Sequence, residues 1–417
     1  MTRAHPGTGG GLPPSLPMAT ADVAYHVATR GRPLPVVFVF WFPGRPPTLD
    51  AVRARVAERA HRIPSLRYGI VRDRKVFRRA DRLPVEQYVH EAELPADDDG
   101  SAAARMMLAH PMAGGGRPPW DVWLLHGPGD DGYALCYRTD HALQDGVGAC
   151  HAVRALLDDH PVGGPAPARL ARPTARGVLG ALGDVVTSLR TGHHPMPALD
   201  AAGGGGTPGV SHTRTPLARL RSIGRAHGGT VNDVYLAALA HAVHTWHLKD
   251  TGAVHPPLPV VIPISVRAAG EECAPGNRMV VARLLLPSDE PSPQRALTRV
   301  MAATGRLRGS RQRDAMRLLL SASPRAVGAR IGTRMVNGAV VAGPASSVNF
   351  GQALVHQGAT SRAATVFSTL ASAVPWVVTL TSQHDTACLT VVHDAALTTA
   401  HELTDLWQAA LLELERP

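Results

Sequence analysis

Residues 132–148 read GYALCYRTDHALQDGVG and contain the pattern from which the fold of this chain can be argued. The first part, residues 132–139, is short and rich in aromatic and apolar side chains, which predicts a strand. A polar segment with His141 follows directly, and Asp145 with Gly146 indicates a turn at its end. Loops that follow strands are where a rigid scaffold presents functional side chains, so His141 is the first candidate for a catalytic residue.

An imidazole at position 141 suits proton transfer. Its unperturbed pKa is about 6.5, so at neutral pH the ring is mostly free to accept a proton. Asp145 lies four positions later and indicates a turn that is anchored by a carboxylate. An HxxxD pair in a loop is also a common structural feature, so the residues alone leave the catalytic and the structural interpretation open.

Strand-like segments occur on both sides of residues 132–139. Each segment is short, apolar and rich in β-branched or aromatic side chains. They lie at residues 34–42, 121–126, 257–266, 279–287, 376–382 and 387–393.

Helix starts lie between these segments. Thr48 predicts the cap of a helix whose apolar residues recur at helical spacing. Thr230 with Asp233, and Thr399 with Glu402, have the spacing of capping boxes, and each pair precedes an apolar helical pattern. Strands and helices therefore alternate along the chain, which predicts an α/β fold of layered domains.

The length of 417 residues exceeds what one hydrophobic core usually organises, so two domains are expected. We expect a flexible leader at residues 1–20, a first domain at 21–160, a linker at 161–213 and a second domain at 214–417. An apolar stripe in the linker predicts a helix that docks on a domain, with a membrane surface as the alternative. The stripe consists of Val178, Leu179, Leu182, Val185, Val186 and Leu189.

The formal net charge of +10 comes almost entirely from arginine, because Lys75 and Lys249 are the only lysines. Neither lysine follows a glycine, so the motif of P-loop nucleotide enzymes is excluded. The arginines are dispersed and are not interleaved with aromatic residues, so we expect no nucleic-acid partner. The positive field fits the phosphates of coenzyme A or of a carrier-protein substrate, or weak contact with an anionic membrane.

Metal-binding and targeting signals are not found in the sequence. The four cysteines form no CxxC pair, and His241, His244 and His247 lack the glutamate of an HExxH motif, so we expect neither disulfides nor a metal. The first residues lack the apolar segment of a secretory signal, and no stretch has the length of a spanning helix. We therefore expect a cytoplasmic location.

The segment DHALQDG at residues 140–146 resembles the HHxxxDG motif of the condensation-domain and chloramphenicol-acetyltransferase superfamily. The likeness is greatest to the wax ester synthase/diacylglycerol acyltransferase branch and extends from about residue 30 to the end of the chain. Further elements that resemble this branch are RPPW at residues 117–120, HRIPSLR at 61–67, TVNDV at 230–234, and PISVR at 263–267 followed by GNR at 276–278.

The resemblance implies two chloramphenicol-acetyltransferase-like α/β domains with an active-site cleft or tunnel between them. His141 matches the motif histidine that acts as general base. Asp145 matches a structural aspartate that pairs with an arginine of the other domain, for which Arg267 is our candidate. Gly146 matches the motif glycine, which implies close approach of the backbone to substrate and an N–H directed at an oxyanion.

The resemblance also indicates supporting positions. Asn232 and Asp233 match an Asn-Asp element that shapes the site or its helix start, and Trp120 keeps the apolar end of the RPPW element. Residues 346–351 are the counterpart of a loop that borders the tunnel. Asp140 occupies the place of the first motif histidine, and substitution inside a signature motif is also how non-catalytic members of such families arise.

The function implied is transfer of an acyl group from a thioester, acyl-CoA or acyl carrier protein, to an alcohol or amine. The altered motif favours a role in specialised-metabolite biosynthesis. Two alternatives stay open, a wax ester or triacylglycerol synthase at a membrane surface and a non-catalytic docking domain. No cofactor is expected beyond the acyl thioester as co-substrate.

Overall fold

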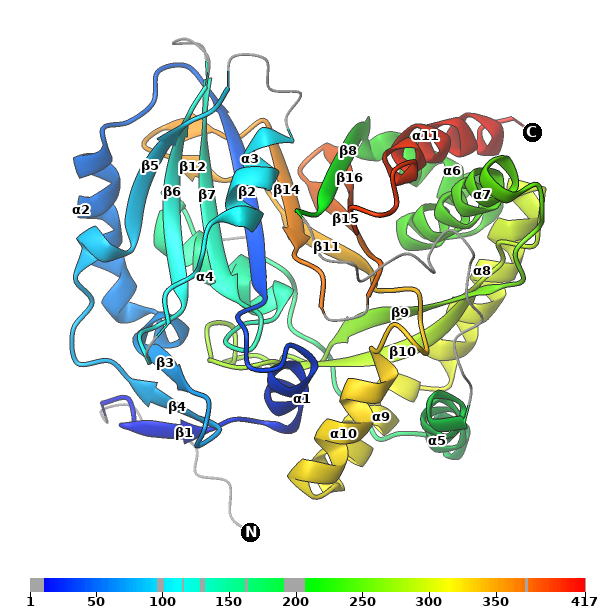
Figure 1. Ribbon diagram of the computed structural model, residues 1–417, viewed down its shortest axis with the longest axis horizontal. Helices are drawn as coiled ribbons and strands as arrows, with labels where there is room; N and C mark the ends of the chain where they lie inside the picture. Colours follow the sequence, from blue (N-terminus) through cyan, green and yellow to red (C-terminus); the bar gives the residue numbers. More distant parts are fainter. Residues whose placement is uncertain are drawn as a thin grey trace.

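Figure 1 shows the computed structural model of the protein, which describes residues 11–95, 101–114, 116–127, 132–161, 164–190, 207–371 and 374–416. In the N-terminal half the elements are β1 (Ser15–Pro17), α1 (Thr20–Ala28), β2 (Pro35–Pro43), α2 (Leu49–Arg59), β3 (Tyr68–Val71), β4 (Val76–Arg79), β5 (Val89–Glu93), α3 (Ala102–Ala109), β6 (Trp120–His126), β7 (Gly132–Asp140) and α4 (Gly146–Leu157).

The C-terminal half begins after helix α5 (Ala175–Arg190). Its first elements are β8 (Gly209–Pro216), α6 (Leu217–His227), α7 (Val231–Thr251), β9 (Leu258–Ser265), β10 (Met279–Leu286), α8 (Pro293–Gly309), α9 (Gln312–Ala322) and α10 (Arg325–Met335). Its last elements are β11 (Ala345–Gly351), β12 (Val355–His356), β13 (Ala359–Thr360), β14 (Ala363–Ser368), β15 (Trp376–Gln383), β16 (Thr386–His393) and α11 (Leu403–Leu414).

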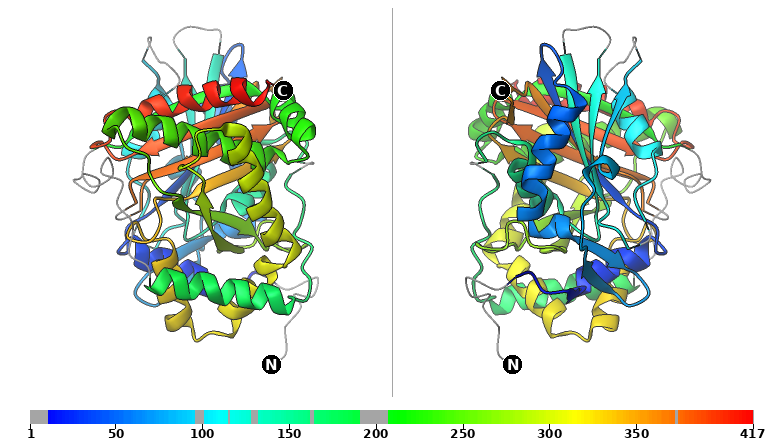
Figure 2. Two further views of the ribbon diagram at one scale, coloured as in Figure 1. Left: turned by 90° about the vertical axis from the view of Figure 1, so that its right-hand side faces the viewer. Right: turned by 90° about the vertical axis from the view of Figure 1, so that its left-hand side faces the viewer.

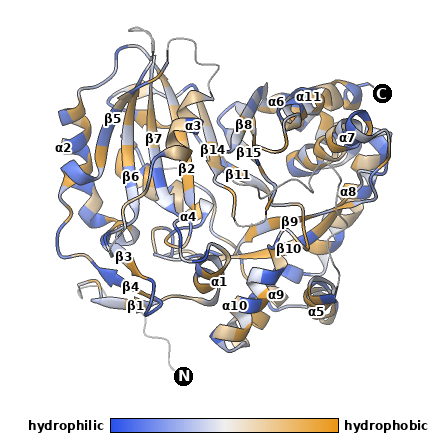
Figure 3. Ribbon diagram, in the orientation of Figure 1, coloured by the Kyte–Doolittle hydropathy of each residue, from blue (hydrophilic) through white to orange (hydrophobic). Residues whose placement is uncertain are grey.

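A five-stranded sheet of order β14-β2-β7-β6-β5 forms the centre of the N-terminal half. Strand β2 is buried on both faces, which explains its continuous run of apolar residues. One face, which includes Phe38 and Phe40, packs against residues of α2 and α4. The other face, with Val37 and Val39, packs against α3 and against Val377 of the C-terminal half. Figure 3 shows the hydrophobic colouring of these strands.

A four-stranded sheet of order β11-β15-β16-β8 forms the centre of the C-terminal half. Helix α7 begins at the predicted capping box, in which Thr230 and Asp233 bind each other's backbone N–H groups. Its side chains from Asp233 to Ala240 are buried on all sides, and Trp246 and Trp407 lie in the same core. The sequence prediction of a layered α/β fold is confirmed.

The β9–β10 hairpin connects the two halves. Its connecting segment, residues 266–278, reaches across to the loop that follows β7 (Figure 1). Gly276 N–H donates to Leu143 O at 2.6 Å, and Gln144 and Gly276 form an isolated parallel bridge. Ser65 N–H donates to Cys273 O at 2.9 Å. The loop with His141 is therefore fixed from both halves.

The domain boundaries differ from the expected ones in three places. Residues 15–17 of the expected leader form β1, which pairs with β4, and α1 already begins at Thr20. Strand β8 begins at Gly209, inside the expected linker, because it pairs with β16. Strand β14 follows β11 in the chain but pairs antiparallel with β2, so a segment of the expected second domain completes the sheet of the first.

The expected linker helix is present as α5, and it packs against α9 and α10. In Figure 2 α5 and the C-terminal helix α11 lie on opposite sides of the molecule. Val178 and Val185 pack against the neighbouring core, as the docking interpretation predicts. The rest of the stripe does not dock, because Leu179, Leu182, Val186 and Leu189 are exposed.

The second predicted capping box is wrong. Thr399 makes no capping hydrogen bond, and its hydroxyl instead accepts from Trp246 Nε1 at 3.0 Å. Glu402 pairs with Lys249 at 2.7 Å, and α11 begins one residue later, at Leu403. Both side chains of the expected box therefore bind residues of α7 in place of each other's backbone.

Within the described ranges, no helix combines the length and the apolar character needed to cross a bilayer.

Candidate active site

The loop between β7 and α4 carries His141 and is rigidly held. His141 N–H donates to Leu34 O at 2.8 Å, which extends the pairing of β7 with strand β2 by one residue. Asp140 Oδ1 accepts from Ala142 N at 3.0 Å, and Asp145 caps α4 by accepting from Gly148 N at 2.7 Å. Each side of the histidine is therefore anchored by an aspartate.

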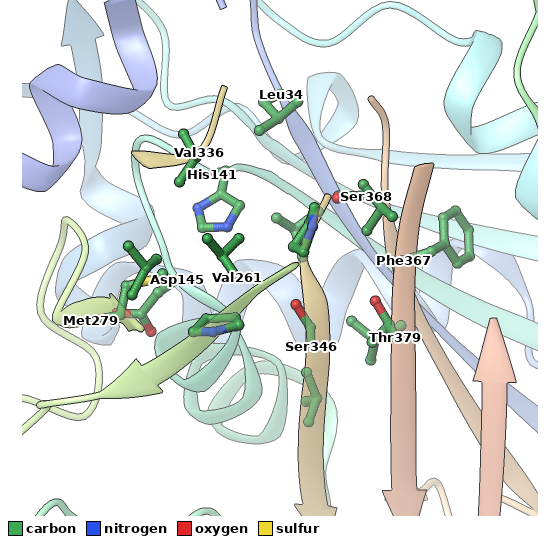
Figure 4. A pocket seen from close by; sticks show the side chains of 18 of the residues that line it. Leu34, His141, Asp145, Val261, Met279, Val336, Ser346, Phe367, Ser368 and Thr379 are labelled. Carbon is green, nitrogen blue, oxygen red and sulfur yellow. The ribbon is translucent and has the colours of Figure 1, made fainter. Parts of the chain in front are cut away.

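His141 lines a cavity of about 320 Å³ between the two halves. Strand β2, α1 and the β7–α4 loop supply one wall, and β9, β10, β11, β14 and β15 supply the others. Figure 4 shows the imidazole opposite strands that carry Ser346 and Thr379. The wall is mainly apolar, and its polar side chains, apart from His141, Asp145 and Tyr25, are Ser265, Ser346, Ser347, Asn349, Ser368, Thr369 and Thr379.

Asn277 determines which nitrogen of His141 carries the proton. The Asn277 amide nitrogen donates to Asp22 Oδ1 at 2.9 Å and to His141 O at 2.8 Å, so its oxygen must face the ring. This Oδ1 lies 3.1 Å from His141 Nδ1. Nδ1 therefore carries the hydrogen in the neutral ring, and Nε2 has the free lone pair. Asp22 also accepts from Asn277 N at 2.6 Å, which holds the amide in place.

The surroundings keep the imidazole neutral. Burial lowers the pKa of His141 below its usual value, while its hydrogen bonds and the nearby Asp145 and Asp140 act in the opposite direction. Tyr25 stacks on the ring, with centroids 4.0 Å apart and planes at 20°. A neutral ring with a fixed tautomer is the form that a general base requires.

Asp145 and Arg267 form a buried ion pair across the two halves. Arg267 Nη2 lies 2.8 Å from Asp145 Oδ2, and both side chains are almost fully buried. Arg267 also donates to the carbonyls of Glu271 and Gly276. Burial by itself raises the pKa of Asp145, but the Arg267 guanidinium and hydrogen bonds from Gly148 and Arg278 hold it below its usual value. The pair ties the β9–β10 segment to the start of α4.

Gly148 makes room for this arginine. A Cβ atom at position 148 would lie 2.6 Å from Arg267 Nη2 and 2.9 Å from its Cζ, closer than such atoms pack. Gly146 has no such constraint, since a Cβ there would meet Val348 at an ordinary 3.7 Å. Gly146 instead lies at the cavity wall as the first residue of α4.

Asp140 lies away from the cavity. It is 1% exposed, pairs with Arg72 and accepts from the N–H groups of Leu34 and Ala142. Consecutive residues at the end of a strand point to opposite sides, which is why Asp140 and His141 have different surroundings. The residue at the first motif position therefore supports the loop from behind.

Three other residues of the predicted set lie outside the cavity wall. Trp120 is buried, stacks on Tyr88 and donates to Leu66 O at 2.9 Å. Asp233 closes the capping box of α7 and accepts from Thr304 Oγ1, and Asn232 lies in the first turn of that helix. Of the two roles expected for the Asn-Asp element, the structure shows support of the helix start.

Residues 346–349, in the segment compared with the tunnel-bordering loop, do line the cavity. Sequence reasoning assigned no role to Asn277, Tyr25, Asp22 or Gly148. Asn277 belongs to the GNR element at residues 276–278, and this resemblance is the one signal in the sequence that could have marked it as a site residue. The other three become recognisable only once α1 and the β9–β10 segment are placed beside the loop.

Two of the three histidines at three-residue spacing on α7 are buried and bind backbone carbonyls. His244 Nδ1 lies 2.9 Å from Ser288 O, and His247 Nδ1 lies 2.8 Å from Ala253 O. No group of three or more potential metal ligands occurs among the residues that the structure describes. The pair His193 and His194 lies outside the described residues.

Two layered α/β halves, with a histidine-bearing cavity where they meet, form the architecture that the sequence resemblance implied. Comparison with known proteins agrees with this architecture. Residues 37–193 match the family model described as the wax ester synthase/diacylglycerol acyltransferase catalytic domain. The resemblance inferred from the motifs is thus confirmed.

Relatives and solved structures extend the comparison. A putative diacylglycerol O-acyltransferase of Mycobacterium tuberculosis is 26% identical over 287 residues, which is 58% of this chain and 60% of that protein. The match therefore spans less than two thirds of the curated relative. The wax ester synthase/diacylglycerol acyltransferase of Marinobacter aquaeolei superposes with a TM-score of 0.65 at 20% identity, over 96% of this chain and 99% of that one.

Condensation domains have the same fold. The first condensation domain of the calcium-dependent antibiotic synthetase superposes with a TM-score of 0.64 at 14% identity, over 96% of this chain and 95% of that one. The starter condensation domain of rhizomide synthetase, in complex with C8-CoA and Leu-SNAC, gives 0.61 at 13% identity, over 96% and 94%. These structures establish the two-halved fold of the protein.

Proposed function

We propose that the protein is an acyltransferase that moves an acyl group from a thioester to a hydroxyl or amine, with His141 as the general base. The observation that carries the proposal is the neutral, tautomer-fixed imidazole on the wall of a cavity that both halves build. The match to an acyltransferase family and the CoA and SNAC ligands of the rhizomide domain support the choice of a thioester donor.

The proposed reaction is a direct transfer. His141 Nε2 takes the proton of the acceptor O–H or N–H while the acceptor oxygen or nitrogen attacks the thioester carbonyl carbon. The oxyanion of the tetrahedral intermediate accepts hydrogen bonds from the N–H groups of Gly146 and Val147, which have no acceptor within α4. The intermediate then collapses, the carbon–sulfur bond breaks, and the thiolate takes the proton from the imidazolium.

Asp145 and Arg267 have a positioning role in this proposal, because their ion pair fixes the start of α4 against the β9–β10 segment. Asn277 has a positioning role toward His141. Asp140 and Trp120 support the loop from outside the cavity. The loss of the first motif histidine therefore leaves the reacting groups in place.

The size of the cavity favours a compact acceptor. A volume of about 320 Å³ lies near the lower end of the range of about 300–1,000 Å³ that is typical of ligand sites. We therefore propose a role in specialised-metabolite biosynthesis in preference to wax ester or triacylglycerol synthesis, with an acyl carrier protein as the alternative donor to acyl-CoA.

Purified protein incubated with a panel of acyl-CoAs and acyl carrier proteins, each with mixed alcohols and amines, tests the proposal by mass spectrometry of the products. We expect an ester or amide with the wild-type protein and a loss of about 10²–10⁴-fold in rate with His141→Ala. Retention of full activity by that variant would refute the general-base role. Binding of the thioesters without turnover of any acceptor would support a non-catalytic docking domain.

A further inference from the structure

Helix α5 has one apolar side buried and a second apolar side exposed. Leu179, Leu182, Val186 and Leu189 follow one another at spacings of three and four residues, so they lie on one face of the helix. Their exposed fractions are 70%, 42%, 43% and 54%. The face extends about 15 Å along the helix, given a rise of about 1.5 Å per residue. Large aliphatic side chains in such a row mark an interaction surface.

Neighbouring helices widen this face. Leu318 of α9 is 42% exposed and Val327 of α10 is 47% exposed, and both helices pack against α5. We call the six residues on the three helices the aliphatic face. Figure 3 shows the predominantly hydrophobic colouring of α5 beside α9 and α10. A face built from three helices is broader than a groove for a single peptide segment.

The charge around the aliphatic face is strongly positive. Residues 169–190 and 311–335 contain ten arginines and only two acidic residues, Asp184 and Asp314. Asp314 is 2% exposed, and the Asp184 carboxylate accepts from Gln312 Nε2 at 2.8 Å, toward α9. The arginines Arg176 and Arg190 are exposed at the two ends of α5. Both acidic groups thus have protein partners, while the solvent side carries arginine.

We propose that the aliphatic face docks on the surface of an anionic lipid bilayer. Aliphatic side chains inserted at the boundary of the acyl chains, with long basic side chains reaching the headgroups, are the chemistry of an interfacial amphipathic helix. Protein interfaces are enriched in aromatic residues, methionine and arginine; the aliphatic face contains no aromatic residue or methionine, and the arginines beside it match the anionic headgroups of a bilayer. The bilayer is therefore the occupant that fits, in preference to an acidic carrier protein.

An apolar path leads from the helices of the aliphatic face to the cavity. A small apolar pocket between α1, α9 and α10, lined by Leu320 and Gly332, shares Tyr25 and Val336 with the cavity that contains His141. Apolar side chains therefore connect the cavity with the helices that carry the aliphatic face. Only this step rests on the proposed function, because the lipid surface would there supply or receive an acyl chain.

Vesicle binding of the full chain, without any acyl substrate, tests the proposal. Co-sedimentation is measured with vesicles of phosphatidylcholine alone and with vesicles that also contain phosphatidylglycerol. We expect binding to the anionic vesicles that weakens with added salt. The double variant Leu179→Asp/Leu189→Asp should bind at least about tenfold more weakly. The matched control Leu248→Asp/Leu412→Asp changes two exposed leucines of α7 and α11 by the same charge, and it should bind like the wild type.

A second variant tests the charge independently of the leucines. Arg176→Glu/Arg190→Glu should lose binding to anionic vesicles by roughly tenfold or more and leave the aliphatic row intact. The His141→Ala variant should bind vesicles like the wild type, so failure of the proposed reaction and failure of the docking proposal are distinguishable. Equal binding by the wild type and the Leu179→Asp/Leu189→Asp variant would overturn the proposal. If the Leu179→Asp/Leu189→Asp variant lost acyl transfer from an acyl carrier protein while its vesicle binding stayed unchanged, the proposal would be overturned in favour of a carrier-protein site.

Discussion

Replacing Asn277 with alanine removes the side chain that fixes the tautomer of His141 and leaves the cavity wall intact. Asn277 is not a wall residue, and its oxygen accepts from His141 Nδ1 at 3.1 Å. In the variant, the ring loses the acceptor that Asn277 supplies to Nδ1, which weakens the preference for a hydrogen on Nδ1 over Nε2, the nitrogen that must receive the proton. The stack on Tyr25 remains, so the ring stays near its position.

The size of the effect follows from the change in charge during the reaction. The bond from Nδ1 to Asn277 is between neutral groups at rest and becomes charge-assisted when the ring is an imidazolium. A hydrogen bond between neutral groups contributes about 0.5–1.5 kcal/mol and one to a charged group about 1.5–3 kcal/mol, so the difference of about 1–1.5 kcal/mol corresponds to about a 5- to 13-fold lower kcat. The KM of the acceptor should stay within about twofold, because Asn277 makes no contact in the cavity that would bind the acceptor before the reaction.

Initial rates of product formation over a pH series measure this effect. Asn277 raises the pKa of His141, so the acidic limb of the profile should move to lower pH in the variant. Asn232→Ala, the corresponding change at the start of α7, is the control and should leave both kcat and the profile unchanged. An unchanged kcat and pH profile in Asn277→Ala would refute the tautomer argument. A raised KM with unchanged kcat would indicate direct contact with substrate.

Three further predictions concern stability. Arg267→Ala leaves the Asp145 carboxylate buried without its partner, so urea denaturation should show a loss of about 3–5 kcal/mol, and the double variant with Asp145→Ala should lose less than the sum. Gly148→Ala should lower Tm because its methyl group would overlap Arg267, whereas Gly183→Ala, on an exposed part of α5 with open space around it, should raise stability by about 0.5–1 kcal/mol. Burial raises the pKa of the Asp22 carboxyl from 3.8 to about 6, so the folded state holds this proton more tightly than the unfolded chain does. The free energy of unfolding should therefore fall by up to about 3 kcal/mol as pH rises from about 4 to about 6. If the wild type and an Asp22→Asn variant had parallel pH dependence, this reasoning would be contradicted.

Local patterns were sufficient to predict most elements and the loop that carries His141. The capping box at Thr230 formed as predicted because both partners lie in one helical turn, and Thr304 binds the other carboxylate oxygen of Asp233 without displacing the cap. The box at Thr399 failed because Trp246 and Lys249, far away in the sequence, bind its two side chains. Local sequence therefore shows which residues can form a capping box, but it does not show which distant residues compete for them.

The same distinction applies to the site. His141 follows its strand, and the motif pointed to the pair of Asp145 and Arg267 that the structure brings together. The contacts of Asn277 with His141 and Asp22 join three segments that are separated by more than a hundred residues. Such contacts depend on the path of the β9–β10 segment across the interface, and no periodicity or spacing in the chain encodes it.

The pairing of β14 with β2 has a consequence for synthesis of the protein. Val39 and Thr365 are partners in this ladder although more than three hundred residues separate them. While the ribosome is still making the middle of the chain, the hydrogen-bonding edge of β2 is uncovered, and uncovered edges favour aggregation. An isolated N-terminal fragment would keep that edge uncovered permanently, so the exposure ends only when the late segment pairs with β2 and completes the sheet.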